Sequence, residues 1–371
     1  MLYFDNAATT KISKTSLDAY VNASECFFNP SSLYAESAKA KALIEESRNY
    51  ILKQLKAKPK STIIFTGSAT ESNNAVLNAH ITRKDKKYVF SAGEHSAIYE
   101  TAKKYQENGY NIVFVPLNKN GSVNVDALMK EIDNTVVLVS IIYVSNETGA
   151  INDIKEITSQ IKEINKNIIV HTDGVQAVAK LEINLKDLDV DYFTMSAHKI
   201  NGPKGIGALY IAEPNKFKPF IIGGGQEMSL RSGTENIPAI CAFRQAIQDI
   251  KIKDYSKHKQ AILDNLQGDY RMVSNSKCID NIISICFKGV RGETILHMLE
   301  AKGYLVGTGS ACNSKAGHNR VLSSIVPNDY IEGAIRISFG EDISIEDCVN
   351  LAVELSNAVK LYRERINRWI K

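Results

Sequence analysis

Cys312 stands in a stretch of sequence that could carry covalent chemistry. The residues around it, GTGSACNSKAGHN at 307–319, are mostly small or polar, with few large apolar side chains. A structural cysteine is usually buried and unreactive, whereas an accessible thiolate is a nucleophile and a metal ligand. Glycine, serine and asparagine also favour turns over regular structure. The sequence therefore predicts an exposed, mobile loop at about 307–320 whose thiol is open to chemistry.

A possible anion site follows the apolar run 63–65. Its sequence is TGSATESNNAV, in which Ser68 and Glu71 have the spacing of a helix capping box. Gly67 lets the backbone turn tightly, and the free N–H groups at a helix start can hold an anion such as phosphate. A helix start without a ligand is the alternative for this motif taken alone.

Two further motifs place reactive side chains at the ends of predicted strands. HTDGVQ carries Asp173, which could cap a helix or face a cationic ligand atom, and Gln176 one turn later. SAHKINGPKGIGALY carries Ser196, His198 and Lys199. This lysine could be solvated, or it could form a Schiff base if its pKa is lowered. The glycines of GPKGIG precede a strand, whereas a dinucleotide fingerprint opens a helix, and no P-loop motif is present.

Together these motifs fit a pyridoxal phosphate site. A helix start holds the phosphate, an acid pairs with the pyridinium nitrogen so that the ring stays an electron sink, and a lysine carries the aldehyde. Each motif is a weak signal alone, but the three in this order are a strong one. No His or Cys grouping has the spacing of a zinc site, and we predict no metal.

Apolar β-rich runs alternate with helical patterns from about residue 60 to 211. The segment 153–165 is one such helix, because its isoleucines share a face. This alternation predicts an α/β fold with a mainly parallel sheet, whose ligands bind beyond the carboxyl ends of the strands. After about residue 240 the pattern indicates a smaller α+β domain, with helices at 240–266, near 293–302 and from about 344. The predicted strands are 62–66, 88–91, 112–116, 135–143, 167–172, 191–195, 206–211, 281–287 and 334–339.

The bulk composition is that of an ordinary globular protein. The 371 residues are 44% hydrophobic and 23% charged, and a formal net charge of +4 is too small to indicate nucleic-acid binding. The longest strongly apolar stretch, 136–144, is far shorter than the about 20 residues of a membrane span. The N-terminus lacks the pattern of a secretory leader. We therefore expect a cytoplasmic protein with reduced cysteines, which are Cys26, Cys241, Cys278, Cys286, Cys312 and Cys348.

Motifs spread from residue 3 to about 340 resemble the NifS/IscS-type cysteine desulfurases, which have the class V aminotransferase fold. They are YFDNAATT, NPSS, FTGSATESNN, GEHSA, VSNETGAINDI, HTDGVQAVAKL, SAHKINGPKGIGALY, GGGQEMSLRSGTENIP, GSAC and AIRISFG. The lysine motif and RSGTEN are highly specific for this family, and GSAC resembles the branch with the longer, mobile cysteine loop. The resemblance implies fold type I of the pyridoxal phosphate enzymes, with a large domain at 14–250 and a small domain formed by 1–13 and 251–371.

By this resemblance the cofactor is pyridoxal 5′-phosphate and Lys199 is the lysine that binds it. Asp173 matches the partner of the pyridinium nitrogen, and Gln176 matches the group that bonds the ring hydroxyl. His95 of GEHSA matches the imidazole stacked on the ring, which can also move protons near neutral pH. The residues matched to the phosphate site are Ala69, Thr70, Ser196, His198 and, reaching the cofactor of the other subunit of a homodimer, Thr234.

The resemblance also implies the substrate and the reaction. Asn146 and Arg336 match a clamp for the carboxylate of L-cysteine, for which arginine offers a planar, bidentate fork. Lys199 would take the proton from Cα, and Cys312, as a thiolate, would attack the substrate sulfur. Alanine would leave, and a persulfide would stay on Cys312 for delivery to a sulfur-acceptor protein.

The sequence departs from the family pattern at two places. Tyr34 stands where histidine is usual, and the stretch between Cys312 and Arg336 is shorter than expected for the branch that serves iron–sulfur scaffolds. His318 could tune the pKa of Cys312 or be a solvated loop residue. The acceptor is therefore left open among an iron–sulfur scaffold, a tRNA-thiolation enzyme and a thiamine-pathway carrier.

Three other functions remain as alternatives. A selenocysteine lyase or cystine C–S lyase would use the same cofactor, but the retention of Cys312 favours a desulfurase. A class V transaminase of a small amino acid would have no use for a thiol loop. A non-catalytic protein that binds a sulfur acceptor is disfavoured, because Lys199, Asp173, His95 and Arg336 are all present.

Overall fold

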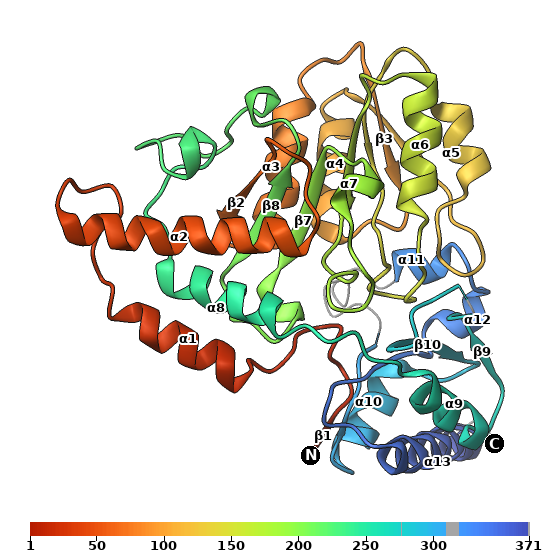
Figure 1. The fold of residues 1–371 in the computed structure, drawn as a ribbon. Coiled ribbons are helices and arrows are strands. Elements are labelled where there is room, and N and C mark those ends of the chain that lie inside the picture. Colours follow the sequence, from red (N-terminus) through yellow and green to blue (C-terminus); the bar gives the residue numbers. More distant parts are fainter. Residues whose placement is uncertain (276, 309–318, 370–371) are drawn as a thin grey trace.

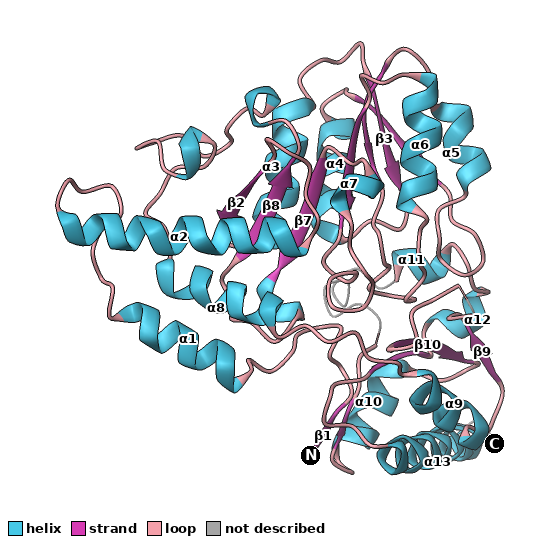
Figure 2. Cartoon of the chain, in the orientation of Figure 1, coloured by secondary structure: helices cyan, strands magenta, loops and turns pink. Residues whose placement is uncertain are grey.

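A sheet of seven strands, in the order β2-β8-β7-β6-β5-β3-β4, forms the centre of the larger part of the chain (Figures 1 and 2). The structure is a computed structural model that describes residues 1–275, 277–308 and 319–369. The strands run the same way except β8, which is antiparallel to both of its neighbours. This mainly parallel sheet confirms the predicted α/β fold. Its strands are β2 (Thr62–Thr66), β3 (Lys87–Ser91), β4 (Asn111–Val115), β5 (Val136–Ser140), β6 (Ile169–Asp173), β7 (Tyr192–Ser196) and β8 (Gly207–Ile211).

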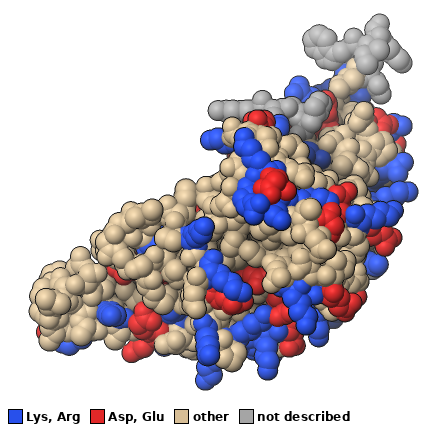
Figure 3. Space-filling model, turned by 90° about the horizontal axis from the view of Figure 1, so that it is seen from above, with Lys and Arg blue, Asp and Glu red and all other residues tan. Residues whose placement is uncertain are grey.

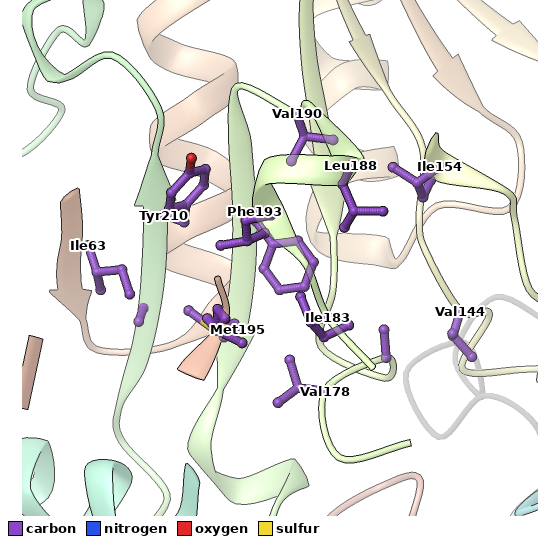
Figure 4. Close-up of a cluster of buried hydrophobic side chains, with 14 of the residues drawn as sticks. Ile63, Val144, Ile154, Val178, Ile183, Leu188, Val190, Phe193, Met195 and Tyr210 are labelled. Carbon is purple, nitrogen blue, oxygen red and sulfur yellow. The ribbon is translucent and has the colours of Figure 1, made fainter. Parts of the chain in front are cut away.

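Helices cover both faces of this sheet, because successive side chains of a strand point to opposite faces. Ile63 of β2 packs with the helices on one face, and Ile64 packs with those on the other. Figure 4 shows part of the first cluster, in which Phe193 and Met195 of β7 lie beside Tyr210 of β8. Full burial of such a side chain contributes about 1.5–3 kcal/mol. The first face carries α2 (Ala35–Gln54), α6 (Ile154–Ile164), α7 (Leu185–Leu188) and α8 (Ile237–Gln248), and the second carries α3 (Ala69–His80) and α4 (Ser96–Glu107).

Side-chain caps start several of these helices where the sequence predicts them. Ser68 Oγ accepts the N–H of Glu71 at 3.2 Å, and Asp153 accepts the N–H of Glu156 at 3.1 Å. Such a cap satisfies one of the N–H groups that a helix start leaves without an internal partner. The predicted helix at 153–165 is thereby confirmed as α6. Two further helices of this part are α1 (Lys14–Ser24), which packs on α8, and α5 (Val125–Glu131).

The smaller part of the chain has its own core, in which Phe4 from the N-terminus packs among residues beyond 260. An antiparallel sheet of order β12-β10-β9 and a parallel pair β1–β11 lie here beside the helices (Figure 2). Among the described residues no helix is both long and apolar enough to cross a membrane. The elements are β1 (Leu2–Tyr3), α9 (Ser256–Asn265), β9 (Tyr270–Met272), β10 (Ile282–Phe287), α10 (Gly292–Glu300), β11 (Tyr304–Leu305), α11 (Arg320–Ser323), α12 (Asn328–Ile331), β12 (Ala334–Ser338) and α13 (Ile345–Trp369).

The prediction of one long helix at 240–266 is wrong. The structure has two helices there, since α8 ends at Gln248 and α9 begins at Ser256. The Asp254 carboxylate accepts the N–H of Ser256 at 2.8 Å, and short acidic side chains compete in this way with a continuous helix. The break leaves 249–255 as a connection between the two parts of the chain.

Charged side chains of both signs are interspersed on the surface. The face in Figure 3 shows Lys and Arg beside Asp and Glu, in keeping with the net charge of +4. Several are paired, such as Lys162 with Asp191 at 2.8 Å. No large patch of like charge covers the described residues on this face.

Gly207 brings the start of β8 against the turn before α3. A Cβ at this position would lie 2.6 Å from the carbonyl carbon of Ser68 and 2.8 Å from the backbone nitrogen of Ala69. Both are backbone atoms, which cannot move away as a side chain can. Only glycine therefore permits this approach between β8 and the predicted phosphate turn.

The free energy of unfolding of the Gly207→Ala variant is expected to be about 2 kcal/mol lower than that of the natural protein, because the added methyl overpacks a backbone contact. Urea denaturation at neutral pH measures this. Gly224→Ala is the control, since there the added Cβ would meet only the flexible end of Gln226. Equal stability of the two variants would contradict the role given to Gly207.

Candidate active site

A cavity of about 340 Å³ opens beyond the carboxyl ends of β6 and β7, within the size range of small-molecule sites. Strands β6 and β7 end at Asp173 and Ser196. Such an edge of a parallel sheet is where ligands are expected. The predicted site residues that line it are Ala69, Thr70, His95, Asn146, Asp173, Gln176, Ser196, His198, Lys199 and Arg336.

The Lys199 amine is held by the N-terminal segment of the chain. Lys199 ends a short 3-10 turn, η1 (Ala197–Lys199), directly after β7. Its Nζ donates hydrogen bonds of 2.7 Å to the carbonyls of Ala7 and Ala8. Gln176 Nε2 donates to the same Ala7 carbonyl at 2.9 Å. Two predicted cofactor residues therefore converge on one backbone group.

Asp173 is buried and fixed in one orientation. Its Oδ2 accepts the side-chain amide of Asn73 at 2.8 Å, and its Oδ1 accepts the N–H of Val175 at 3.0 Å. The ring of Phe193 packs so closely on Gly174 that a Cβ there would lie 2.0 Å from it. The carboxylate is thus aimed by its neighbours on both sides, and it remains an acceptor for a cationic ligand atom.

His95 is a neutral imidazole at the start of α4. Its Nδ1 accepts the N–H of Ala97 at 3.2 Å, so that the proton of the neutral ring lies on Nε2. Burial lowers the pKa of His95, and the positive charge of Lys199 acts in the same direction, while Asp173 opposes it. His95 can therefore offer an N–H to a ligand in the cavity.

The turn before α3 is closed by a carboxylate. Glu71 Oε2 accepts the N–H of Gly67 at 2.8 Å. In a standard capping box this glutamate would bond the N–H of the N-cap residue, here Ser68, so the bond is displaced by one residue. His198 lies across from this turn, with its Nδ1 3.0 Å from Thr9 Oγ1. Burial and then the charge of Lys199 lower the pKa of His198 to about 4. His198 is therefore neutral at physiological pH.

Arg336 reaches the cavity from β12 with part of its hydrogen-bonding capacity unused. One terminal nitrogen donates to the carbonyl of Asn146 at 2.9 Å, and the other donates to Asp5 at 2.8 Å. Its Nε is buried without a partner among the described residues. A guanidinium has five N–H donors, so a ligand carboxylate can still be bound. The structure thus brings Asn146 and Arg336 into contact.

The polar cavity residues that sequence reasoning missed include Glu94, Glu147, Asn319 and Arg320. Arg320 donates to the carbonyls of Ala92 and Glu94, and its guanidinium lies 3.7 Å from the centre of the Tyr99 ring. Asn319 donates to Glu147 at 3.1 Å. The sequence carries a signal that could have predicted Glu94 and Glu147, because they adjoin His95 and Asn146 in the motifs GEHSA and VSNETG.

The two acids are strongly affected by burial. Burial raises the pKa of Glu94 well above its usual range, and the charge of Asp173 adds to this. Burial also raises the pKa of Glu147 to about 6, although Arg336, Asn319 and Arg320 act against it. Perturbed acids in a cavity are typical of functional sites.

Among the described site residues that the sequence predicts, Thr234 is exposed and is not one of those that line the cavity. Cys312 and His318 lie outside the described residues. The other five cysteines are unpaired, and Cys278, Cys286 and Cys348 are buried.

The full length of the chain is similar to one family of proteins. Residues 2–351 match the family model described as aminotransferase class-V. The chain belongs to the class-V aminotransferase family. Within it, the named relatives are cysteine desulfurases: cysteine desulfurase IscS of Clostridium botulinum is 34% identical over 390 residues, covering 99% of this chain and 96% of the relative.

Solved structures agree with this assignment. A NifS-like protein superposes with a TM-score of 0.88 at 31% identity, over 97% of this chain and 99% of its own. A structure titled SspA in complex with cysteine has a TM-score of 0.83 at 28% identity, over 91% of this chain and 99% of its own. The fold is therefore that of the pyridoxal phosphate enzymes of fold type I, and this class uses pyridoxal 5′-phosphate.

The residues present fit this cofactor. Gln176 Oε1 is buried with no hydrogen-bond partner among the described residues, and it can accept from a ring hydroxyl. Asp173 offers a carboxylate to a ring nitrogen, and α3 offers free N–H groups to a phosphate. Lys199 supplies the amine that reacts with an aldehyde.

The Glu147→Gln variant is expected to be more stable than the natural protein at pH 7.5, by on the order of 1–2 kcal/mol. Because the folded-state pKa of Glu147 is raised from 4.5 to about 6, the folded protein binds more protons than the unfolded chain in this window. Stability is therefore lost as pH rises from 4.5 through 6. The variant escapes this loss, and its advantage should shrink toward pH 4.5.

Urea denaturation at pH 5 and pH 7.5 measures the effect. Glu163→Gln, on an exposed position of α6, is the matched control and should show no such trend. An advantage of the Glu147 variant that does not change with pH would rule out ionisation of this carboxyl as the cause.

Proposed function

We propose that this protein is a pyridoxal phosphate-dependent cysteine desulfurase that converts L-cysteine to L-alanine. The observation that carries the proposal is the cavity itself: Lys199, Asp173, His95 and Arg336 converge there, in a chain similar over 99% of its length to cysteine desulfurases. When bound, the cofactor supplies a ring that stabilises negative charge on the substrate carbon atoms.

The substrate is positioned by its carboxylate. Arg336 lines the cavity, and its bonds to Asn146 and Asp5 occupy two of its five N–H donors. A bidentate pair with a carboxylate fixes both position and orientation. The Asn146 side chain, which also lines the cavity, would complete the clamp. In this proposal Cα of cysteine lies between Arg336 and Lys199.

Protons are handled by Lys199 and His95. The Lys199 amine takes the proton from Cα of the substrate, and the carbonyls of Ala7 and Ala8 orient that amine. His95 offers its Nε2 proton, since its Nδ1 accepts the N–H of Ala97. Asp173 and Gln176 hold the ring, and Ala69, Thr70, Ser196 and His198 hold the phosphate.

Cys312 is the sulfur carrier in this proposal. Its thiolate attacks the sulfur of cysteine, so that an S–S bond forms while the Cβ–S bond of the substrate breaks. The electron pair of that bond stays on Cβ, which takes a proton, the proton held by Lys199 returns to Cα, and alanine is released. The persulfide on Cys312 then passes its outer sulfur to an acceptor protein of iron–sulfur cluster assembly or of a thiolation pathway in the cytoplasm.

A homodimer would complete the site. Thr234 is exposed on this chain, as expected of a residue that reaches the cofactor phosphate of a second subunit. Phe27, Leu33 and Ile222 are largely exposed apolar side chains, and the end of the molecule at the left of Figure 3 carries few charges. We place the large domain at 14–250 and the small domain at 1–13 and 251–371.

Replacement of Cys312 tests the reaction. The Cys312→Ala variant should keep its visible cofactor absorbance but lose alanine formation from L-cysteine by about 10²-fold or more, because no thiolate accepts the sulfur. Cys26→Ala, at a half-buried position, is the control and should retain activity. If both variants release alanine at the natural rate, Cys312 is not the carrier, and the selenocysteine lyase or C–S lyase reaction becomes the better assignment.

Replacement of Arg336 tests the carboxylate clamp. The Arg336→Lys variant keeps the charge but loses the planar fork, so KM for L-cysteine should rise by about tenfold or more, with a smaller change in kcat. Initial-rate kinetics measure both constants. Arg365→Lys, at an exposed position of α13, should leave both unchanged. An unaltered KM in the Arg336 variant would exclude this residue from substrate binding.

A further inference from the structure

A bidentate ion pair stands directly behind the phosphate turn. Arg231 Nε donates to Glu71 Oε1 at 2.8 Å, and a terminal nitrogen of Arg231 donates to Glu71 Oε2 at 3.3 Å. Glu71 Oε2 also accepts the N–H of Gly67 at 2.8 Å. The carboxylate is therefore bonded to the turn on one side and to the guanidinium on the other.

Without this arginine, the carboxylate would be badly placed for an anion site. A phosphate group carries a charge of about −1.5 to −2 near neutral pH, and a like charge beside it weakens its binding. The side chain of Glu71 is only 18% exposed, so water screens it poorly. Among the described residues Arg231 is the one ion-pair partner of Glu71.

Arg231 is itself held on a rigid support. Glu227 forms a second bidentate pair with the buried Arg48, with bonds of 2.8 and 3.1 Å, and accepts the N–H of Phe65 in β2. Residues 227–229 form a left-handed turn with φ values of 49°, 59° and 65°. Such a run of non-glycine residues is strained, and it persists only where its surroundings fix it. Arg231 follows that turn by two residues.

We propose that Arg231 is a positioning residue for the cofactor phosphate, which acts by neutralising Glu71, the carboxylate that closes the turn. Arg231 does not touch the phosphate in this arrangement. Its charge allows the Glu71 carboxylate to stay bonded to Gly67 without repelling the phosphate bound at the start of α3. This inference rests on the proposed function, because it takes that turn to be the phosphate site.

The inference predicts an unequal effect of removing the two partners. Arg231→Met leaves an unpaired carboxylate at the turn. Glu71→Gln removes the negative charge, so that no positive charge from Arg231 is needed to neutralise it. The single Arg231 variant should therefore bind the phosphate poorly. The Glu71 variant and the double variant should bind it nearly as well as the natural protein does.

The test compares pyridoxal 5′-phosphate with pyridoxal, which has the aldehyde but no phosphate. Each is titrated into the full-length protein after removal of the cofactor, and the visible absorbance gives the dissociation constant. Arg231→Met should lose about tenfold or more in affinity for pyridoxal 5′-phosphate but little for pyridoxal. Arg231→Gln, which keeps a hydrogen-bond donor without the charge, should act in the same direction if Arg231→Met folds poorly.

A matched ion pair provides the control. Lys162 and Asp191 lie 2.8 Å apart with side chains 17% and 22% exposed, close to the 24% and 18% of Arg231 and Glu71. Lys162 is outside the residues that line the cavity, and Lys162→Met should leave both dissociation constants unchanged.

The outcomes separate this inference from the function on which it rests. Equal losses for the two ligands in Arg231→Met, or a double variant as weak as Arg231→Met, would show a merely structural role and overturn the inference alone. A natural protein that binds pyridoxal as tightly as pyridoxal 5′-phosphate would overturn the inference together with the phosphate site. Loss of the phosphate preference in Arg231→Met, with recovery in the double variant, is the supporting result.

Discussion

The site depends on the carbonyl groups of Ala7 and Ala8, which receive the Lys199 amine. This backbone segment belongs to neither core alone. The Ala7 N–H donates to Ser338 Oγ at 2.8 Å, which ties it to β12, and the Thr10 N–H donates to the carbonyl of His198 at 2.9 Å, which ties it to the turn after β7. The parallel strands supply Lys199 and β12 supplies Arg336. The N-terminal segment fixes how the two meet.

Buried charge in the cavity is balanced group by group, because an unpaired charge in a low-dielectric interior is costly. Arg336 is paired with Asp5, and Arg320 is bound to backbone carbonyls. Burial raises the pKa of Glu94 well above its usual range, which favours the neutral form of this carboxyl over a buried charge. Glu147 is the exception, and its raised pKa means that the fold keeps a carboxylate that weakens it. The cost to stability indicates that Glu147 serves the site and not the stability of the fold.

Local pattern was enough to predict the strands of the large sheet, because their apolar runs are short and are bounded by turns. It also predicted cavity residues at or just beyond the carboxyl end of a strand, such as Asp173 and Lys199. It failed where the deciding contact is distant in sequence. The Asp5–Arg336 and Glu71–Arg231 pairs join residues 331 and 160 positions apart, and no period or spacing shows them. The break after Gln248 was missed because one local hydrogen bond, which the Asp254 carboxylate accepts from the N–H of Ser256, competes with a continuous helical pattern.

The reach of the N-terminal segment has a consequence during synthesis. The contacts of Ala7 with Ser338 and of Asp5 with Arg336 each span 331 positions. At about 5–20 residues per second, the ribosome needs on the order of 20–60 s to make the second partner after the first has emerged. The seven-stranded sheet can form in that interval, and Gln176 and the turn after β7 can then bind the N-terminal segment, but the bonds of this segment to Ser338 and Arg336 wait for β12. A nascent chain therefore assembles the lysine side of the pocket before β12 brings Arg336 to it.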